Sequence, residues 1–314
     1  MPLPRLPLSP LPVVVATLAA CTLAGPAAAQ DRGSVNPKPL PPLANPNDPS
    51  TPAKALFGRV TGPTGGPAQS FGSYAKGCFS GGESLPMDGS NWQVMRPSRN
   101  RMWGVPHLVN FIERLAAQAP RTGWSGLLVG DMSQPRGGPM LTGHASHQLG
   151  LDVDVWLTPM PDHRMSRAER EETSATNVVR ADRLDIDPDV WTSQHTALIR
   201  MTARQPEVAR IFVNPAIKKA LCREASGDRG WLNKVRPMYG HNYHYHIRLA
   251  CPGGEGSCDD QAPPPPGDGC GAELDYWFSP AILNPPKPKT PPKPRPPMTL
   301  AGLPDACRAV LHAR

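Results

Sequence analysis

Two short stretches, in which apolar and polar residues alternate, constrain the fold of this chain more than any other feature. The first reads GHASHQLGLDVDVW over residues 143–156, and the second reads GHNYHYHIRLAC over residues 240–251. Five of the nine histidines in the 314-residue chain lie in these two stretches. Core or surface histidines without a common function would be scattered, so the clustering predicts one site built from two distant parts of the sequence.

The alternation predicts that both stretches contain a half-buried β-strand. Asp152 and Asp154 recur with a period of two in LDVDVWL, and His244 and His246 do so in YHYHIRL. Alternate residues of a strand project from the same face of a sheet. If the two strands are antiparallel neighbours, carboxylates and imidazoles face each other across them. Glycines bracket the first histidine pair and predict a tight loop that delivers His147 to this face.

The side chains in these stretches are ligands that a hydrolytic zinc ion uses. Zinc binds histidine nitrogens and carboxylate oxygens, and a catalytic zinc has three protein ligands and one open position. His147 and Asp154 have the spacing His-x6-Asp, but neither stretch completes a ligand set alone. We therefore predict a zinc site shared by both stretches. The H-E-x-x-H motif of other metalloproteases is absent, so its glutamate cannot be the general base.

The spacing resembles that of the lysostaphin, D-Ala-D-Ala metallopeptidase and hedgehog group, whose zinc ligands follow His-x6-Asp and His-x-His. Longer blocks are similar to the penicillin-insensitive murein endopeptidases. These blocks cover most of residues 70–280 and read SRNRMWG (98–104), GDMSQPRGGPMLTGHASHQLGLDVDVW (130–156), IFVNPAIKKALC (211–222) and KVRPMYGHNYHYHIRLACP (234–252). The resemblance implies that His147, Asp154 and His246 bind zinc.

The resemblance also implies roles for the other polar residues of the two stretches. His244 is the expected general base, since it lies two residues before His246 on the same strand face. His241 is expected to orient His244 or to stabilise the oxyanion, and His144 to do likewise or to contact the metal. Asp152 is a candidate acceptor for a histidine N–H; the alternative is a surface aspartate.

The resemblance implies a substrate as well. Penicillin-insensitive murein endopeptidases hydrolyse the D-alanyl–meso-diaminopimelyl cross-links of peptidoglycan, and no serine nucleophile is expected for penicillin to acylate. Arginine forks suit the carboxylates of such a substrate. Arg136 is the first candidate, followed by Arg99 and Arg101; the alternative for each is a structural arginine. Two rival functions remain: a D-Ala-D-Ala carboxypeptidase, and a non-catalytic zinc module that binds the cell wall.

The N-terminus predicts export. Residues 1–29 contain Arg5, an apolar stretch over 11–25 and a small-residue cleavage site at 27–29, which together are typical of a secretory signal peptide. We therefore expect a periplasmic protein. LAAC at 18–21 offers the alternative of a lipoprotein anchored through Cys21, the one case in which we expect membrane attachment.

Cysteine usage agrees with export. Removal of residues 1–29 leaves six cysteines, which can pair in fifteen ways and suggest disulfides in an oxidising compartment. Cys251 and Cys258 close a short glycine-containing loop and form a natural local pair. We expect the remaining pairs to be Cys222–Cys270, enclosing the second histidine stretch, and Cys78–Cys307, tying together the two ends of the domain.

Composition divides the chain into four parts. After the signal peptide, residues 30–54 predict a disordered leader or linker, and residues 55–279 predict the zinc peptidase domain. Within it, apolar spacing predicts helices over 107–119, 192–203 and 215–222, a capped helix from Ser166, and strands over 124–130 and 206–213. Residues 280–314 predict a proline-rich basic segment, extended over 280–297, and a tail that docks through Cys307. The fold class is thus α+β, with an antiparallel sheet that carries the zinc ligands, flanked by helices and disulfide-stapled loops.

Charge argues against nucleic acid as a partner. The net charge of +7 falls to +6 when Arg5 leaves with the signal peptide. Four of these charges lie in the proline-rich segment, at Lys287, Lys289, Lys293 and Arg295. The basic balance is therefore a property of the tail, which suits weak attraction to an anionic cell surface. A separate acidic group predicts a solvated loop, and the alternative is a site for a second cation; its members are Asp182, Asp185, Asp187 and Asp189.

Overall fold

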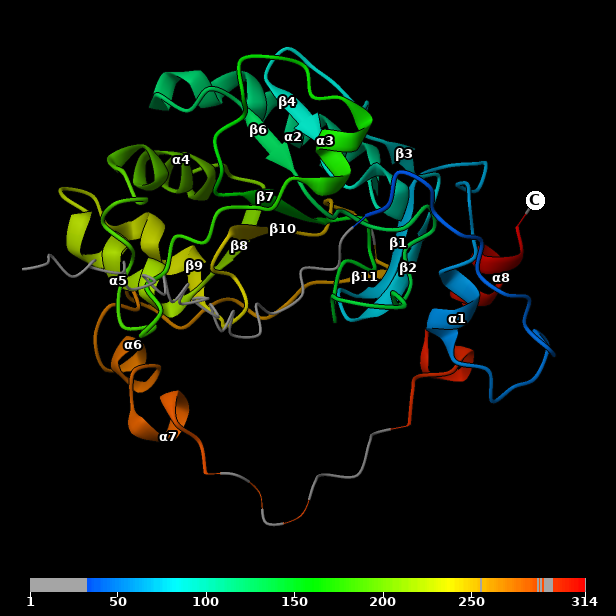
Figure 1. Ribbon diagram of the computed structural model, residues 1–314. Coiled ribbons are helices and arrows are strands. Elements are labelled where there is room, and N and C mark those ends of the chain that lie inside the picture. The colour runs from blue at the N-terminus through cyan, green and yellow to red at the C-terminus, as the bar shows by residue number, and fades with distance from the viewer. Residues whose placement is uncertain (1–32, 255, 287, 289, 291–295, 314) are drawn as a thin grey trace, which may run out of the picture. The chain divides into compact units, whose positions relative to one another are not determined.

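The computed structural model describes residues 33–313 except 255, 287, 289 and 291–295 (Figure 1). The expected signal peptide, Cys21 and the four basic residues of the proline-rich segment lie outside the described residues. Within the described part of the chain, no helix is both long enough and apolar enough to cross a membrane.

A six-stranded sheet in the order β4-β6-β7-β10-β8-β9 carries both histidine stretches. Its strands are β4 (Trp92–Val94), β6 (Leu127–Val129), β7 (Asp152–Trp156), β8 (Val208–Val213), β9 (Val235–Pro237) and β10 (His244–Leu249). β7 and β10 are antiparallel neighbours in the middle of the sheet, which is the condition under which the carboxylates and imidazoles were expected to face each other (Figure 1). Their register places His246 opposite Asp154 and Arg248 opposite Asp152.

The sheet is mixed, so the prediction of an antiparallel sheet is wrong at both edges. β4 pairs with β6 and β9 pairs with β8 in parallel, whereas the three pairings between them are antiparallel. Helix α2 (Pro106–Gln118) lies between β4 and β6 in the chain, and α5 (Pro215–Glu224) lies between β8 and β9. Parallel neighbours need such a crossover connection. A period of two predicts which face a side chain occupies but not the direction of the strand.

Helices α2, α4 (Ser193–Ala203) and α5 bury one face of the sheet. Leu108, Phe111, Ile112 and Leu115 recur on α2 at helical spacing and are almost completely buried. The same core contains the side chains of β7 and β10 that point to this face, namely Val153, Val155, Tyr245 and Ile247. Because side chains alternate across a strand, the acids and histidines of β7 and β10 occupy the opposite face.

Most of the helices and strands expected within the domain are confirmed. The predicted helices correspond to α2, α3 (Arg167–Glu172), α4 and α5, and the predicted strands to β6 and β8. Ser166 and Glu169 form the capping box expected at the start of α3. One short helix, α7 (Pro280–Leu283), stands where an extended segment was expected; Pro280 occupies its first turn, a position that proline favours.

Some of the remaining helices and strands join the two ends of the domain. The remaining elements are α1 (Ala53–Phe57), β1 (Gln69–Ser73), β2 (Lys76–Ser80), β3 (Glu83–Ser84), β5 (Trp103–Gly104), β11 (Cys258–Asp259), α6 (Ala272–Tyr276) and α8 (Ala306–His312). Strands β11, β1 and β2 form a second sheet, and α1 and α8 share a small apolar cluster with Cys78. Three disulfides close this architecture with the pairing expected above, Cys78–Cys307, Cys222–Cys270 and Cys251–Cys258.

Candidate metal centre

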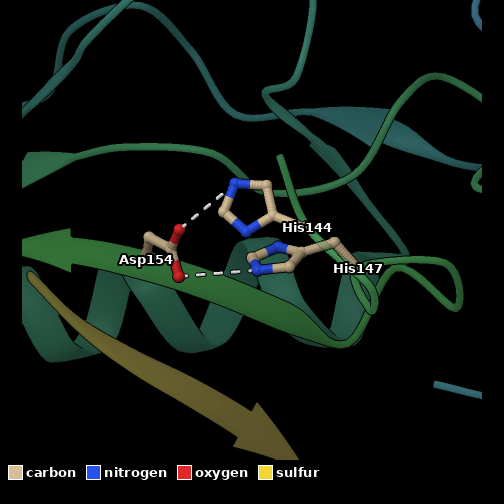
Figure 2. Close-up of side chains that lie close together, drawn as sticks. All are labelled: His144, His147 and Asp154. Carbon is tan, nitrogen blue, oxygen red and sulfur yellow. Dashed lines mark ion pairs between the residues drawn. The ribbon is translucent and has the colours of Figure 1, made fainter. Parts of the chain in front are cut away.

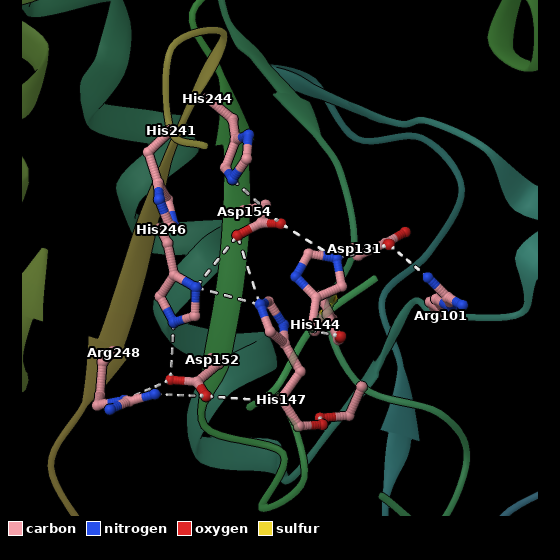
Figure 3. A network of polar contacts seen from close by, with 12 residues as sticks. Arg101, Asp131, His144, His147, Asp152, Asp154, His241, His244, His246 and Arg248 are labelled. Carbon is pink, nitrogen blue, oxygen red and sulfur yellow. Dashed lines mark hydrogen bonds and ion pairs between the residues drawn. The ribbon is translucent and has the colours of Figure 1, made fainter. Parts of the chain in front are cut away.

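Three side-chain atoms from three parts of the chain converge on the open face of β7 and β10 (Figure 3). His147 Nε2 lies 3.2 Å from His246 Nδ1, and Asp154 Oδ1 lies 3.4 Å from each of them. In a tetrahedral zinc site with bonds of about 2.0–2.1 Å, two ligand atoms are about 3.3–3.4 Å apart. The three atoms, which we call the ligand triangle, therefore have the spacing of ligands to a single ion.

The carboxylate of Asp154 supplies an independent sign that a cation belongs here. Asp154 is buried, and its Oδ1 has no hydrogen-bond partner among the described residues. Burial alone would raise the pKa of this carboxyl, but the neighbouring histidines His244, His147 and His144 outweigh it and hold the pKa well below its usual value. A buried, ionised oxygen without a partner is costly. An ion bound in the triangle would remove that cost.

Both histidines of the triangle present an unprotonated nitrogen to it. Nδ1 of His147 donates to the Met132 carbonyl at 3.0 Å, which leaves the lone pair on Nε2. Nε2 of His246 lies 3.1 Å from Asp152 Oδ1, so its proton belongs on that nitrogen and the lone pair on Nδ1. Burial also lowers the pKa of His246 to about 4, which keeps the ring neutral near pH 7. The ligand tautomers are thus set by the fold.

The backbone delivers His147 to the triangle in an unusual conformation. His147 has φ 63°, the left-handed region that residues other than glycine seldom adopt. Its backbone N–H donates to Asp152 Oδ2 at 2.9 Å. Gly143 and Gly150 bracket the loop with φ 85° and φ 72°, as the sequence predicted. A Cβ on Gly150 would lie 2.9 Å from the Val105 nitrogen, so this close approach also requires glycine.

Asp152 holds both histidines of the triangle, one through its ring and one through its backbone. Its side chain is almost completely buried, which excludes the alternative of a surface aspartate. Arg248 donates to it through Nε at 2.9 Å and Nη2 at 3.2 Å. The Arg248 guanidinium lies 4.1 Å from the centre of the Tyr74 ring. This bidentate pair holds the carboxylate in one orientation.

His144 lies on another side of Asp154. Its Nε2 is 2.9 Å from Asp131 Oδ2 and 3.6 Å from Asp154 Oδ2. Burial lowers the pKa of His144, but the charges of Asp154 and Asp131 outweigh it, so that the pKa is raised. His144, His147 and Asp154 could themselves hold a metal ion, since one ligand atom of each lies within 4.8 Å of the others (Figure 2). This set is more widely spaced than the ligand triangle, with which it shares two members.

His244 and His241 lie next to the triangle. His244 is buried, and its Nε2 is 3.5 Å from Asp154 Oδ2. The two oxygens of Asp154 therefore differ: Oδ1 belongs to the triangle, whereas Oδ2 lies between His144 and His244. Burial lowers the pKa of His244 to about 3, so its imidazole is neutral at pH 7. His241 is partly exposed, with its ring 4.9 Å from that of His244 and its Nδ1 3.1 Å from the Tyr239 carbonyl.

The arginines expected to bind substrate have other partners. Arg136 Nη1 donates to the carbonyls of Val310, Leu311 and Ala313, and its Nε donates to Gly62. The carbonyls of Val310, Leu311 and Ala313 lie at the C-terminal end of α8, where a cation is favourable. The described contacts of Arg136 are thus with these carbonyls and not with a residue of the metal centre. A long side chain on a loop can reach a distant element, so proximity in sequence to the histidines does not place Arg136 beside them, and its role in substrate binding stays a prediction.

Arg99 and Arg101 do lie beside the centre, where they bind Asp131. Nη1 of each is 2.9 Å from a carboxylate oxygen of Asp131. Sequence reasoning did not single out Asp131 or Arg248. The signal for Arg248 was its place two residues after His246 on the same strand face. The signal for Asp131 was an acid directly after the buried strand β6 and Gly130.

Two aspartates of the acidic loop form ion pairs with arginines. Asp185 pairs with Arg223 at 2.9 Å, and Asp182 pairs with Arg180. None of these aspartates belongs to the group of described residues that could hold a metal ion, which lies at the metal centre.

Comparison with known proteins identifies relatives along most of the chain. Residues 70–312 match a family model described as penicillin-insensitive murein endopeptidase. Proteins of that name from Klebsiella pneumoniae subsp. pneumoniae and Salmonella heidelberg are 47% and 48% identical to this chain over 255 residues. Each alignment covers 81% of this chain and 89% of the relative. The matched region contains the ligand triangle and all the histidines around it.

Proposed function

Because the chain belongs to the penicillin-insensitive murein endopeptidase family, we propose that it is a zinc endopeptidase that hydrolyses the D-alanyl–meso-diaminopimelyl cross-links of peptidoglycan. The observation that carries this proposal is the ligand triangle: His147 Nε2, Asp154 Oδ1 and His246 Nδ1 lie 3.2–3.4 Å apart. The protein acts as a peptidoglycan-hydrolysing metallopeptidase; the identity of the metal and of the bond are the proposed parts.

Two nitrogens and one carboxylate oxygen form a donor set that suits zinc. We assign His147, Asp154 and His246 as the protein ligands, because their spacing matches a tetrahedral site more closely than the set that contains His144. A zinc ion held there would acidify a water molecule and polarise the scissile carbonyl.

The histidines around Asp154 Oδ2 supply the proton transfer. His244 lies beside Asp154 on the strand that carries His246, and we assign its imidazole as the group that accepts the proton of the attacking water and passes it to the leaving amine. Asp154 Oδ2, 3.5 Å away, stabilises the imidazolium that forms. His241 packs against His244 and limits the orientations of its ring. His144 approaches the same oxygen from the other side, at 3.6 Å.

The cell wall as substrate implies export. We propose that residues 1–29 are a signal peptide and that the protein works in the periplasm. Three disulfides support an oxidising compartment. The tail follows the proline-rich segment, and the Cys78–Cys307 disulfide would keep it docked to the domain.

Digestion of purified cross-linked muropeptide dimers tests the function. The expected product is the monomer, without free D-alanine, in a reaction that a zinc chelator stops, added zinc restores and benzylpenicillin leaves unchanged. Asp154→Asn should be inactive, whereas Asp189→Asn, a change of the same kind in the exposed acidic loop, should retain full activity. Free D-alanine as the main product would instead identify a carboxypeptidase. Binding to sacculi without any product would identify a non-catalytic module.

A further inference from the structure

Three histidines of the metal centre, His144, His147 and His246, each place one ring nitrogen against a fixed acceptor. His147 uses the Met132 carbonyl, and His246 uses Asp152. His144 uses Asp131, at 2.9 Å. The parallel suggests that Asp131 serves His144 as Asp152 serves His246. The contact between Asp152 and His246 follows from the pairing of two strands. The contact between Asp131 and His144 joins two loops, so strand pairing does not account for it.

Asp131 is buried and tightly held. Arg99 and Arg101 each donate to it at 2.9 Å, one to each carboxylate oxygen. Its backbone carbonyl accepts the Asp154 N–H at 2.9 Å, which ties it to the strand of the triangle. Burial opposes ionisation, but His144, Arg99 and Arg101 outweigh it and keep the pKa of Asp131 well below its usual value. The carboxylate is therefore a charged acceptor with a defined orientation.

Arg101 connects this carboxylate to the loop that carries His144. Its Nη2 donates to the carbonyl and hydroxyl oxygens of Thr142, both at 3.1 Å. Thr142 precedes His144 by two residues, and Gly143 between them has φ 85°. One guanidinium thus fixes the loop backbone, while Asp131 fixes the ring at its end. The His144 side chain is 22% exposed, so packing alone restrains it less than it restrains the buried His147.

We propose that Asp131, clamped by Arg99 and Arg101, is a positioning residue that holds the His144 ring in one orientation beside Asp154, with Nε2–H directed at the Asp131 carboxylate. Figure 2 shows the His144 ring beside His147 and Asp154. Without the carboxylate, the ring could rotate or exchange its tautomer, and Arg99 and Arg101 would each lose a carboxylate partner. His144 would then be present but wrongly oriented.

A double-mutant cycle between Asp131→Asn and His144→Ala tests this inference. The quantities measured are the zinc dissociation constant of the metal-stripped protein, by calorimetry, and kcat and KM on muropeptide dimers. Asp131→Asn should change the same quantities as His144→Ala, in the same direction, by roughly 10–100-fold. The double variant should match His144→Ala, since Asp131 acts through that ring. Independent, additive effects overturn the proposal, and so does a His144→Ala variant with unchanged values.

Asp88→Asn is the matched control. Asp88 also pairs with a buried arginine, Arg170, whose other hydrogen-bond acceptors do not belong to the metal centre. The Asp88→Asn substitution should lower the midpoint of thermal unfolding and leave zinc affinity and kcat unchanged. If Asp131→Asn behaves like Asp88→Asn, Asp131 is merely structural and the inference fails.

A second variant guards against misfolding of Asp131→Asn. Arg99→Gln removes one clamp at a more exposed position and leaves Arg101 in place. It should shift the same quantities by a smaller factor, and unchanged values would overturn the proposal. The measurements of kcat and KM rest on the proposed function, but the double-mutant cycle on the zinc dissociation constant does not. A wild-type protein that cleaves no muropeptide would therefore refute the function and still allow the test of Asp131.

Discussion

Asp152→Asn should weaken both the fold and the metal centre, because one carboxylate supports three groups. It accepts two hydrogen bonds from Arg248 and one from the His147 backbone, and it lies 3.1 Å from His246 Nε2. Asparagine has the same shape but only one acceptor oxygen, and its amide group would point N–H donors at Arg248 or at the His147 N–H. Arg248 would also lose its only carboxylate partner among the described residues.

Asp152→Asn should lower both the free energy of unfolding and the affinity for zinc. Removal of one member of a buried ion pair costs about 3–5 kcal/mol of unfolding free energy. Loss of an acceptor behind a metal-ligating histidine costs roughly 10–100-fold in metal affinity, or about 1.4–2.7 kcal/mol. The second effect requires folded protein, so it is measured at a temperature where the variant remains native.

The stability loss should depend on pH with a definite sign. Burial raises the pKa of Asp152, but Arg248 and His246 outweigh it, so the folded pKa lies far below the ordinary value of 3.8. A depressed carboxyl pKa stabilises the fold above the unfolded value, and this contribution is lost as the pH falls through the folded value. The difference between wild type and Asp152→Asn should therefore be constant above about pH 5 and shrink below pH 3.8.

Denaturant unfolding of the metal-stripped proteins from pH 2 to 8 measures the free energy of unfolding, and zinc calorimetry measures the metal affinity. Asp189→Asn in the exposed loop is the control and should match wild type in both. Adding Arg248→Met to Asp152→Asn should recover part of the stability, because it removes the uncompensated charge. Wild-type stability and zinc affinity in Asp152→Asn would refute the role assigned to this carboxylate.

Three further predictions concern other residues. His147→Ala, Asp154→Ala and His246→Ala should each lose zinc and activity, and stoichiometric zinc in all three purified proteins would contradict the ligand assignment. His244→Ala should keep zinc while kcat falls by roughly 10²–10⁴-fold; loss of zinc from His244→Ala but not from His246→Ala, by elemental analysis, would reverse the two roles. Lys218 is fully buried and donates to the carbonyls of Leu232 and Asp268, and burial lowers its pKa to about 7. Between about pH 7 and 10.5 the unfolded chain binds a proton that the folded one releases, so stability should rise with pH over this range in wild type. Lys218→Met should lack that part of the rise in denaturant titrations, and an unchanged pH slope would show that Lys218 is charged in the fold.

Most of what could be predicted about the metal centre came from the period of two in its strands. The alternation in LDVDVWL and YHYHIRL predicted that Asp152 and Asp154 share one strand face and that His244 and His246 share another; the antiparallel pairing of the two strands then places His246 opposite Asp154. Local signals predicted the capping box of Ser166 and the glycine-bracketed loop of His147. These features depend on residues close together in the chain, whose geometry follows from the pleat, from hydrogen bonds within one turn and from backbone sterics.

The sequence by itself therefore determined which side chains could meet at the centre, because a period of two sorts residues by face whatever the strands pair with. Tertiary structure decided the rest. The direction of the edge strands depends on the crossover helices α2 and α5, which the strand pattern does not encode. Arg99 and Arg101 bind Asp131, whereas Arg136 binds the end of α8. The difference depends on where each long side chain finds an acceptor in the folded chain. The acceptors behind the histidines are likewise a tertiary property, since Asp131 and His144 meet only where two loops pack together.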